Sequence, residues 1–470
     1  MDKQDKITDF LLIRPSYYDT ENRKLDLTTS LILMPPVGLG YVAAACREEF
    51  NVRIIDMEAE RIKINDLLRH IESFSPKVIG ITVMSSTLEQ TKEIIRTIKE
   101  KRNIPIIIGG PHAILDPVSI FEIDNVDYIV CGEAEVMIND LLDFLIYKKG
   151  EIDKIKNLVY KTNGKIHFTE KELIKNLDCI PFPRRELWEK DNYFHFFARG
   201  KPCTSIITSR GCPYTCVYCT PIYRSIRRRS IGNVIQEIKE IIDRFSIRDL
   251  EFFDETFNLN EAWVIEFCQE LLKERLLISW RARCRPDLIT EEAIKWMKRA
   301  GCYMISLGIE SANNNTLKFF NKNYVVSQIK EAIKIIKKYG IELHAYFIIG
   351  SPTETKKETW HTIYFAIKEN LDYAIFSLLT PQPGTKLMEI SLRNKWLSKE
   401  DFDYNKIKGY CIPVLKHPQL SPKEILKIYK MATMLFFARP KRIFNLSKRI
   451  IFNRGTKRSI IIKTILNYLF

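Results

Sequence analysis

Short apolar runs alternate with helical patterns along most of this 470-residue chain, and this alternation limits its fold more than any other feature. Strands separated by helices favour parallel sheets that are covered by helices. The alternation occurs in two blocks, and the chain is too long for one ordinary domain, so the sequence predicts an α/β protein of two or three domains. Ligands of such sheets bind at the carboxyl ends of the strands, where candidate site residues are therefore expected.

The first block predicts a doubly wound, Rossmann-like domain over residues 1–150. Its expected strands are 10–13, 52–55, 78–83, 105–108 and 128–130, and its expected helices are 38–49, 87–100 and one that begins at residue 135. Two further strands, 158–162 and 165–168, flank an Asn-Gly pair that is typical of a two-residue hairpin turn. We interpret residues 151–195 as a linker that contains this hairpin.

The second block predicts six strand-helix units over residues 196–400, which suggests a partial (β/α) barrel. The expected strands are 205–208, 250–253, 279–282, 304–307, 343–349 and 373–378, with helices at 234–245, 262–272, 291–300, 328–338 and 358–369. Residues 401–470 are expected to form a helical, basic C-terminal region.

Three cysteines, Cys212, Cys216 and Cys219, lie within eight residues just after the first strand of the second block. Several thiolates on one short loop can hold an iron-sulfur cluster. The spacing C-x3-C-x2-C does not fit the usual zinc pattern, and no local fourth ligand is present. Three thiolates on a four-iron cube leave one iron open to a small molecule. A structural zinc loop, a redox thiol pair and a chance spacing are the alternatives.

The cysteine loop resembles that of the radical S-adenosylmethionine (SAM) enzymes, in which an aromatic residue, here Tyr218, precedes the last cysteine. The resemblance implies a 4Fe-4S cluster whose open iron binds SAM and whose electron cleaves SAM to a 5′-deoxyadenosyl radical. It also assigns SAM contacts to later strand ends: Asp254 and Glu255 to the amino group, Glu310 and Ser311 to the carboxylate or ribose, and Gly350 and Pro352 to the adenine. Arg283, after the third strand, is a further candidate for cofactor binding. For Asp254, a helix cap is the alternative.

Small and polar residues also follow the strands of the first block. Together they resemble the cobalamin-binding domain that precedes the radical domain in one large class of radical SAM enzymes, through Pro36, Gly38, Leu39, Ser85, Ser86, Gly109, Gly110, His112, Gly132 and Glu133. Glycine and serine also end strands merely to turn the chain. No G-x-G-x-x-G follows the first strand, which gives a dinucleotide site little support.

The resemblance further implies cobalamin without a protein imidazole on its lower face. Where a cobalt-ligating histidine stands in the methionine-synthase type of domain, this chain has the sequence Asp-Met-Glu-Ala-Glu at residues 56–60. We expect His112 to contact the corrin ring or its tail. The alternative is a strand-end side chain bonded to backbone.

Charge and cysteine content bear on partners and location. Of a net charge of +15, nine Lys and Arg and no acid fall in residues 431–470, so a basic tail is indicated and no nucleic acid is expected. Such a tail could contact a membrane surface; a helix packed on the barrel is the alternative. Eleven scattered cysteines and no secretion signal favour a cytoplasmic protein, with membrane association left open.

The function implied by the resemblance is methylation of an unactivated carbon, with 5′-deoxyadenosyl radical, cobalamin and a second SAM taking part. The substrate, small or lipid-like, is not evident, and a flavodoxin- or ferredoxin-like electron donor is expected. The alternatives are oxidation, cyclisation or rearrangement, as in the anaerobic magnesium-protoporphyrin cyclase, and a non-enzymatic cobalamin-binding sensor. A methylthiotransferase needs an N-terminal cluster, for which only Cys46 and Cys131 are present.

Overall fold

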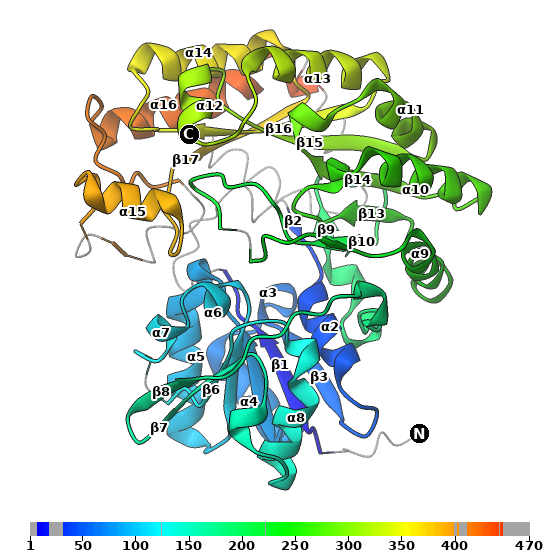
Figure 1. The fold of residues 1–470 in the computed structure, drawn as a ribbon, viewed down its shortest axis with the longest axis vertical. Coiled ribbons are helices and arrows are strands. Elements are labelled where there is room, and N and C mark those ends of the chain that lie inside the picture. Colours follow the sequence, from blue (N-terminus) through cyan, green and yellow to red (C-terminus); the bar gives the residue numbers. More distant parts are fainter. Residues whose placement is uncertain are drawn as a thin grey trace. The chain divides into compact units, whose positions relative to one another are not determined.

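The computed structural model describes residues 7–17, 32–123, 125–220, 222–398, 402–403, 411–440 and 442–444. The chain divides into two compact units, Met1–Lys24 with Pro35–Asn192 and Leu25–Met34 with Tyr193–Phe470 (Figure 1). The main sheet of each unit is built mainly of parallel strands that alternate with helices. The predicted α/β class is confirmed.

The first unit holds a seven-stranded sheet in the order β3-β1-β4-β5-β6-β7-β8. From β1 the chain passes first to β3 on one side and then to β4 on the other. The strand order therefore reverses between β1 and β4, and doubly wound sheets bind ligands at such a position. The strands are β1 (Phe10–Arg14), β3 (Val52–Asp56), β4 (Val78–Thr82), β5 (Ile106–Gly109), β6 (Tyr128–Val130), β7 (Leu158–Thr162) and β8 (Lys165–Phe168). The helices include α2 (Val37–Ala45), α4 (Ile64–Phe74), α5 (Leu88–Lys101), α6 (Pro111–Leu115) and α8 (Ile138–Leu142).

The predicted hairpin forms, but it belongs to the first sheet. Strand β7 pairs antiparallel with β6, and its residues Leu158 and Val159 are fully buried. At the tip, Asn163 and Gly164 have φ values of 49° and 77°, the left-handed pair that a two-residue turn requires. The sequence interpretation placed this hairpin in a linker, whereas burial of its first strand adds it to a unit that extends to Asn192.

The second unit holds a six-stranded parallel sheet whose strands follow one another in chain order, as expected of a partial barrel. They are β10 (Cys203–Ile206), β13 (Asp249–Phe252), β14 (Ser279–Cys284), β15 (Cys302–Glu310), β16 (Glu342–Ile349) and β17 (Tyr373–Leu378). Between them lie α9 (Ile231–Phe245), α10 (Glu261–Lys273), α11 (Glu291–Arg299), α13 (Val326–Lys338) and α14 (Lys356–Lys368), which follow one another around the outside of the strands (Figure 1).

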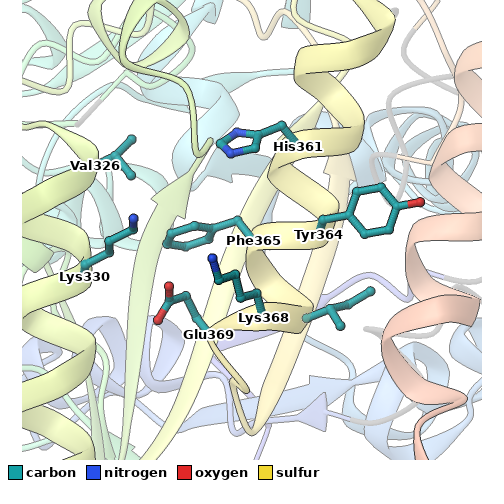
Figure 2. A pocket seen from close by; sticks show the side chains of 8 residues that line it. Val326, Lys330, His361, Tyr364, Phe365, Lys368 and Glu369 are labelled. Carbon is teal, nitrogen blue, oxygen red and sulfur yellow. The ribbon is translucent and has the colours of Figure 1, made fainter.

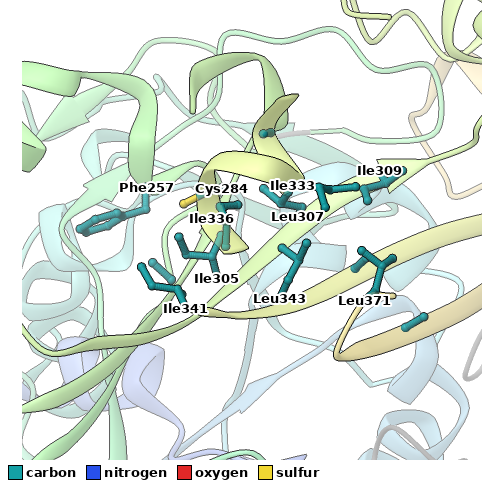
Figure 3. Packing of buried hydrophobic residues seen from close by; sticks show 14 of the residues in the cluster. Phe257, Cys284, Ile305, Leu307, Ile309, Ile333, Ile336, Ile341, Leu343 and Leu371 are labelled. Atoms are coloured by element: carbon teal, nitrogen blue, oxygen red, sulfur yellow. The ribbon is translucent and has the colours of Figure 1, made fainter. Parts of the chain in front are cut away.

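The two faces of this sheet differ in polarity, because successive side chains of a strand point to opposite faces. On the helix-covered face, Ile305 and Leu343 pack with Ile333 and Ile336 of α13 in one apolar core (Figure 3). The other face of β13 to β16 carries polar side chains that lie in register across the strands: Glu251, Arg281, Arg283, Ser306 and His344. This polar face is the interior of the barrel.

The C-terminal region is partly described. Helix α16 (Pro422–Phe437) packs against β17, and its Ala432 and Phe436 are fully buried. Arg442 is also buried and donates to Asp372 Oδ1 at 3.0 Å. The described part of the basic tail therefore follows the packed-helix alternative, while residues 445–470 lie outside the described residues. Among the described helices, none combines the length and apolar composition needed to cross a bilayer.

Candidate active site

The cysteine loop is closed by backbone contacts at its base. Two short strands, β11 (Ser209–Arg210) and β12 (Arg227–Arg228), pair antiparallel, and the Cys212 amide donates to the Tyr223 carbonyl at 2.9 Å. Gly211 lies between them with φ of 101°, and a Cβ there would stand 2.3 Å from the Ser225 carbonyl oxygen. Only glycine fits that conformation and that space, so the loop geometry depends on it.

The three thiols interact electrostatically. Desolvation and the negative charges of Cys216 and Cys212 raise the pKa of the Cys219 thiol to about 12. Because Cys219 is exposed as a residue, the neighbouring thiolates are the more relevant cause. Thiolates that repel one another are stabilised by a metal centre, which keeps coordinating thiols deprotonated.

The donor set fits a cluster better than a single ion. Among the described residues, no three His, Cys, Asp or Glu side chains are arranged to hold one metal ion. The thiolates of a cubic cluster need not meet at one point, because each binds a different iron.

Asp254, at the end of β13, binds the chain that leads into the cysteine loop. Its fully buried carboxylate accepts hydrogen bonds from the Thr208 amide at 2.7 Å and the Ser209 amide at 3.1 Å, and from the Thr208 hydroxyl. Because Thr208 and Ser209 do not begin a helix, the alternative that Asp254 is a helix cap does not describe its contacts. Desolvation by burial raises the pKa of the Glu255 carboxyl. As a whole residue Glu255 is exposed and Asp254 is buried, so Glu255 is the one of these two acids at the surface of the site.

A buried lysine that sequence reasoning missed joins the fourth strand to the cysteine loop. Lys322 Nζ donates to Glu310 Oε1 at 3.0 Å and to the Tyr218 hydroxyl at 3.1 Å. The Glu310 and Lys322 side chains are only 10% and 8% exposed. Strand β15 is irregular between Gly308 and Glu310, where a Cβ on Gly308 would meet Glu310 Oε1 at 2.6 Å. Lys322 thus joins two predicted residues, Tyr218 and Glu310.

The end of β14 supports the loop from another direction. The Arg285 guanidinium lies 3.4 Å from the ring centroid of Tyr214, in the cysteine loop, and makes two hydrogen bonds to Asp287, at 3.0 and 3.1 Å. It also donates to the Lys322 carbonyl at 2.7 Å. A cation stacked on an aromatic ring and held by a carboxylate fixes both groups, so the loop is rigidly placed.

Three of the predicted SAM contacts, Ser311, Gly350 and Pro352, are buried within the protein. Ser311 is fully buried and donates to Glu354 Oε1 at 2.8 Å. Pro352 is buried, and Gly350 has φ of 87° with Ile425 of α16 3.4 Å from where its Cβ would be. The glycine is needed for the turn; Ser311 links two strand ends through Glu354.

In the first unit, His112 is bonded on both nitrogens. Its Nδ1 lies 2.9 Å from Ser85 Oγ and its Nε2 3.2 Å from Ser119 Oγ, and the residue is fully buried. Burial lowers the pKa of the imidazole, which keeps it neutral. A ring engaged in this way is not available to ligate a metal. Both of these partners are side-chain hydroxyls, whereas the alternative expected a bond to backbone, and contact of His112 with the corrin ring or its tail stays a prediction.

The small residues of the first unit fall into two groups. Cβ atoms at Gly110 and Gly132 would meet Thr82 Oγ1 at 2.6 Å and Asn157 Cγ at 2.5 Å, so these glycines serve internal packing. A Cβ at Gly38, in the first turn of α2, has nothing within 4 Å, and a Cβ at Gly109, at the end of β5, has only Val130 at 3.9 Å, which leaves open space at both glycines.

The remaining predicted residues of this unit are placed as follows. Glu133 is buried and accepts from the Ile174 amide at 2.8 Å, while Pro36 and Leu39 are buried at the start of α2 and Ser86 is half-buried. Glu133 therefore ties the segment after the hairpin to the sheet.

Comparison with known proteins decides what these features belong to. Residues 23–142 match the B12 binding domain family, and residues 206–366 match the Radical SAM superfamily. The chain is 35% identical over 443 residues to the uncharacterized methyltransferase PH0819 of Pyrococcus horikoshii, covering 93% of this chain and 94% of that one. The chain belongs to the cobalamin-dependent radical SAM enzymes.

Other relatives and solved structures agree with this family. The anaerobic magnesium-protoporphyrin IX monomethyl ester cyclase of Rubrivivax gelatinosus is 27% identical, over 83% of this chain and 72% of its own length. The structure of OxsB with aqua-cobalamin and SAM has a TM-score of 0.72 at 18% identity, covering 98% of this chain and 75% of OxsB. TsrM from Kitasatospora setae, with cobalamin and a [4Fe-4S] cluster, has a TM-score of 0.67 at 19% identity, covering 82% and 74%. The fold is shared.

This cobalamin-dependent radical SAM enzyme is of the methyltransferase type, and its cofactors are a 4Fe-4S cluster, SAM and cobalamin. The predicted family and cofactors are confirmed, and the sensor alternative finds no support. The residues that hold each cofactor stay predictions.

A cavity of about 360 Å³ on the outside of the barrel of this radical SAM enzyme is separate from these residues (Figure 2). It is lined by Val326 and Lys330 of α13 and by His361, Tyr364 and Phe365 of α14. Because helices alone line it and no strand end reaches it, we do not place the chemistry there.

The buried Glu354 predicts a pH-dependent stability. Burial raises the pKa of its carboxyl to about 7 from 4.5. Its contribution to stability is therefore full below about pH 4.5 and is lost as the pH rises through about 7, a difference of roughly 3 kcal/mol. Glu354→Gln, which cannot ionise, is expected to flatten the fall in thermal stability between about pH 5 and 8.

The control for this variant is Glu331→Gln on the exposed side of α13. It should keep the wild-type pH profile. Identical profiles for Glu354→Gln and the wild type would show that Glu354 does not ionise in this range in the folded protein.

Proposed function

We propose that this enzyme methylates an unactivated carbon of its substrate, with the cluster bound by Cys212, Cys216 and Cys219. The observation that carries this proposal is the electrostatic interaction of the three thiols on one short loop, whose base is closed by backbone contacts. When bound, the cluster supplies the electron that cleaves SAM and cobalamin supplies the methyl group.

The second-unit residues around the loop have distinct proposed roles. Glu255, exposed beside the cysteine loop, binds the SAM amino group, while Asp254 positions the loop. Lys322 holds Tyr218 and Glu310 in place and keeps positive charge close to the cluster ligands, since its charge lowers the pKa of Cys219. Positioning of this kind is what a radical reaction asks of the protein.

In the first unit we propose that cobalamin lies beside Gly109, at the end of β5, and Gly38, in the first turn of α2. The open space at these glycines supports this placement. The internal bonding of His112 supports cobalamin without a protein imidazole on its lower face.

Partners and location belong to the same proposal. A flavodoxin- or ferredoxin-like protein would supply the electron for SAM cleavage. The charge of residues 431–470, nine Lys and Arg without an acid, supports peripheral contact of the end of the chain with an anionic surface.

The test is product analysis after anaerobic reconstitution with SAM, cobalamin and reductant, on lipid and tetrapyrrole extracts. Methyl transfer predicts S-adenosylhomocysteine and 5′-deoxyadenosine in about equal amounts, together with a methylated product. 5′-Deoxyadenosine without S-adenosylhomocysteine would instead favour the cyclase-like alternative, which the 27% identical cyclase keeps in consideration. Formation of neither product would contradict both.

A further inference from the structure

A cluster of polar side chains on the interior face of the barrel has no role in the site described above. Arg283 of β14, Ser306 of β15 and His344 of β16 lie on one rung, since Arg283 pairs in register with Ser306 and Ser306 with His344. Glu251 of β13 lies beside them, bonded to Arg283 and to Arg281. These side chains lie on the face of the sheet that the outer helices do not cover.

Arg283 is the cation of this cluster whose hydrogen-bond donors are incompletely used. Its guanidinium lies 3.8 Å from the ring centroid of Phe253, and its Nη2 makes one long hydrogen bond, 3.3 Å, to Glu251 Oε1. Its Nε is buried and has no hydrogen-bond partner among the described residues, while 39% of the side chain is exposed. Glu251 is shared with Arg281 at 3.1 Å, so it only partly neutralises Arg283.

His344 presents a second buried donor. The residue is 2% exposed, its Nδ1 lies 3.4 Å from Ser306 Oγ, and its Nε2 has no partner among the described residues. Burial and the charges of Arg283 and Arg281 lower the pKa of the ring to about 3, so it is neutral and carries one N–H. A buried polar nitrogen without a partner is costly, and in a binding site a ligand removes that cost.

The charges around the rung decide which ligand fits. Arg281 and Arg283 face Asp249 and Glu251, so the cluster is balanced before a ligand binds. A doubly charged phosphate would leave a large excess of negative charge in the barrel. A carboxylate carries one charge, and its two oxygens match the planar fork of a guanidinium.

We propose that Arg283 and His344 form a subsite for a carboxylate group of the substrate. The inference rests on the proposed function, because it takes the barrel interior as the space where the substrate reacts. SAM also carries a carboxylate, and Arg283 is among the residues expected to bind a cofactor. His344 lies five residues before the end of β16, below the strand ends, which favours the substrate as the source.

The experiment compares phenylacetate with its neutral analogue phenylacetamide as probes, by equilibrium dialysis against the anaerobically reconstituted full-length enzyme with SAM. We expect phenylacetate to bind about tenfold or more tightly than phenylacetamide. Arg283→Gln and His344→Gln should each remove most of that difference, and Arg283→Lys, which keeps the charge, should keep part of it. Arg248→Gln removes an exposed charge elsewhere on the barrel and should have no effect.

The possible outcomes separate the sources of the carboxylate. Equal binding of acid and amide, or variants that bind phenylacetate like the wild type, would overturn the subsite. So would an Arg283→Gln enzyme whose only loss is in SAM affinity, since the carboxylate would then be that of SAM. Iron content and circular dichroism of each variant report whether it is folded.

The proposed function is tested separately in the same preparation, by 5′-deoxyadenosine formation in the wild type. Deoxyadenosine formation without selective acid binding would overturn the subsite alone. Selective acid binding without deoxyadenosine would overturn the function and leave a binding site.

Discussion

Replacing Cys212, Cys216 or Cys219 with alanine is expected to abolish formation of 5′-deoxyadenosine. Each variant leaves two thiolates where three are required, and the reconstituted protein should fall from about four irons per chain to a small fraction of that. Iron and sulfide analysis and the deoxyadenosine assay, both under anaerobic conditions, measure the two effects.

The matched control is Cys179→Ala, an exposed cysteine outside the loop. It should retain wild-type iron content and activity. A loop variant that kept four irons and wild-type deoxyadenosine formation would show that the cluster is bound elsewhere.

Lys322→Met is expected to destabilise the second unit by about 3–5 kcal/mol, because it leaves the buried Glu310 carboxylate without its cation. Methionine has a similar length, so the loss reflects charge more than volume. The Tyr218 hydroxyl also loses its donor, and cluster assembly should become less efficient. Chemical denaturation of the metal-free protein, followed by circular dichroism, measures the stability.

A second variant distinguishes charge from packing. Lys322→Met combined with Glu310→Gln should recover most of the lost stability, since no unpaired buried charge remains. Lys330→Met, on the exposed side of α13, is the control and should be nearly neutral. If the double variant were no more stable than Lys322→Met alone, the ion pair would not be what holds this region together.

Much of the fold could be predicted from the sequence because its signals are local. The strand runs of the second block recur as β10 and β13 to β17 within a few residues of their expected bounds. Helix α4 was not predicted, although its buried Leu67, Leu68 and Ile71 have helical spacing. The pairing of β2 (Ile32–Leu33) with β9 (Phe194–His195) joins distant segments and has no local signal.

The site was predictable in its position but not in its internal contacts. The family resemblance pointed to Tyr218 in the cysteine loop and to Asp254 and Glu310 after their strands, where the carboxyl ends of parallel strands gather at one edge. It did not find that Asp254 turns toward the cysteine loop or that Lys322 pairs with Glu310. Those contacts depend on side-chain direction and on the φ values of 56° and 57° at Asn321 and Asn323, which flank the lysine.

The central claim is that three cysteine thiolates hold a cluster whose fourth iron is open to SAM. Mössbauer spectroscopy of protein reconstituted with iron-57, recorded with and without SAM, tests it most directly. We predict that SAM changes the signal of one iron in four and leaves the other three nearly unaltered. Four irons that stay equivalent when SAM is added, or a metal centre already saturated by four side chains, would contradict it.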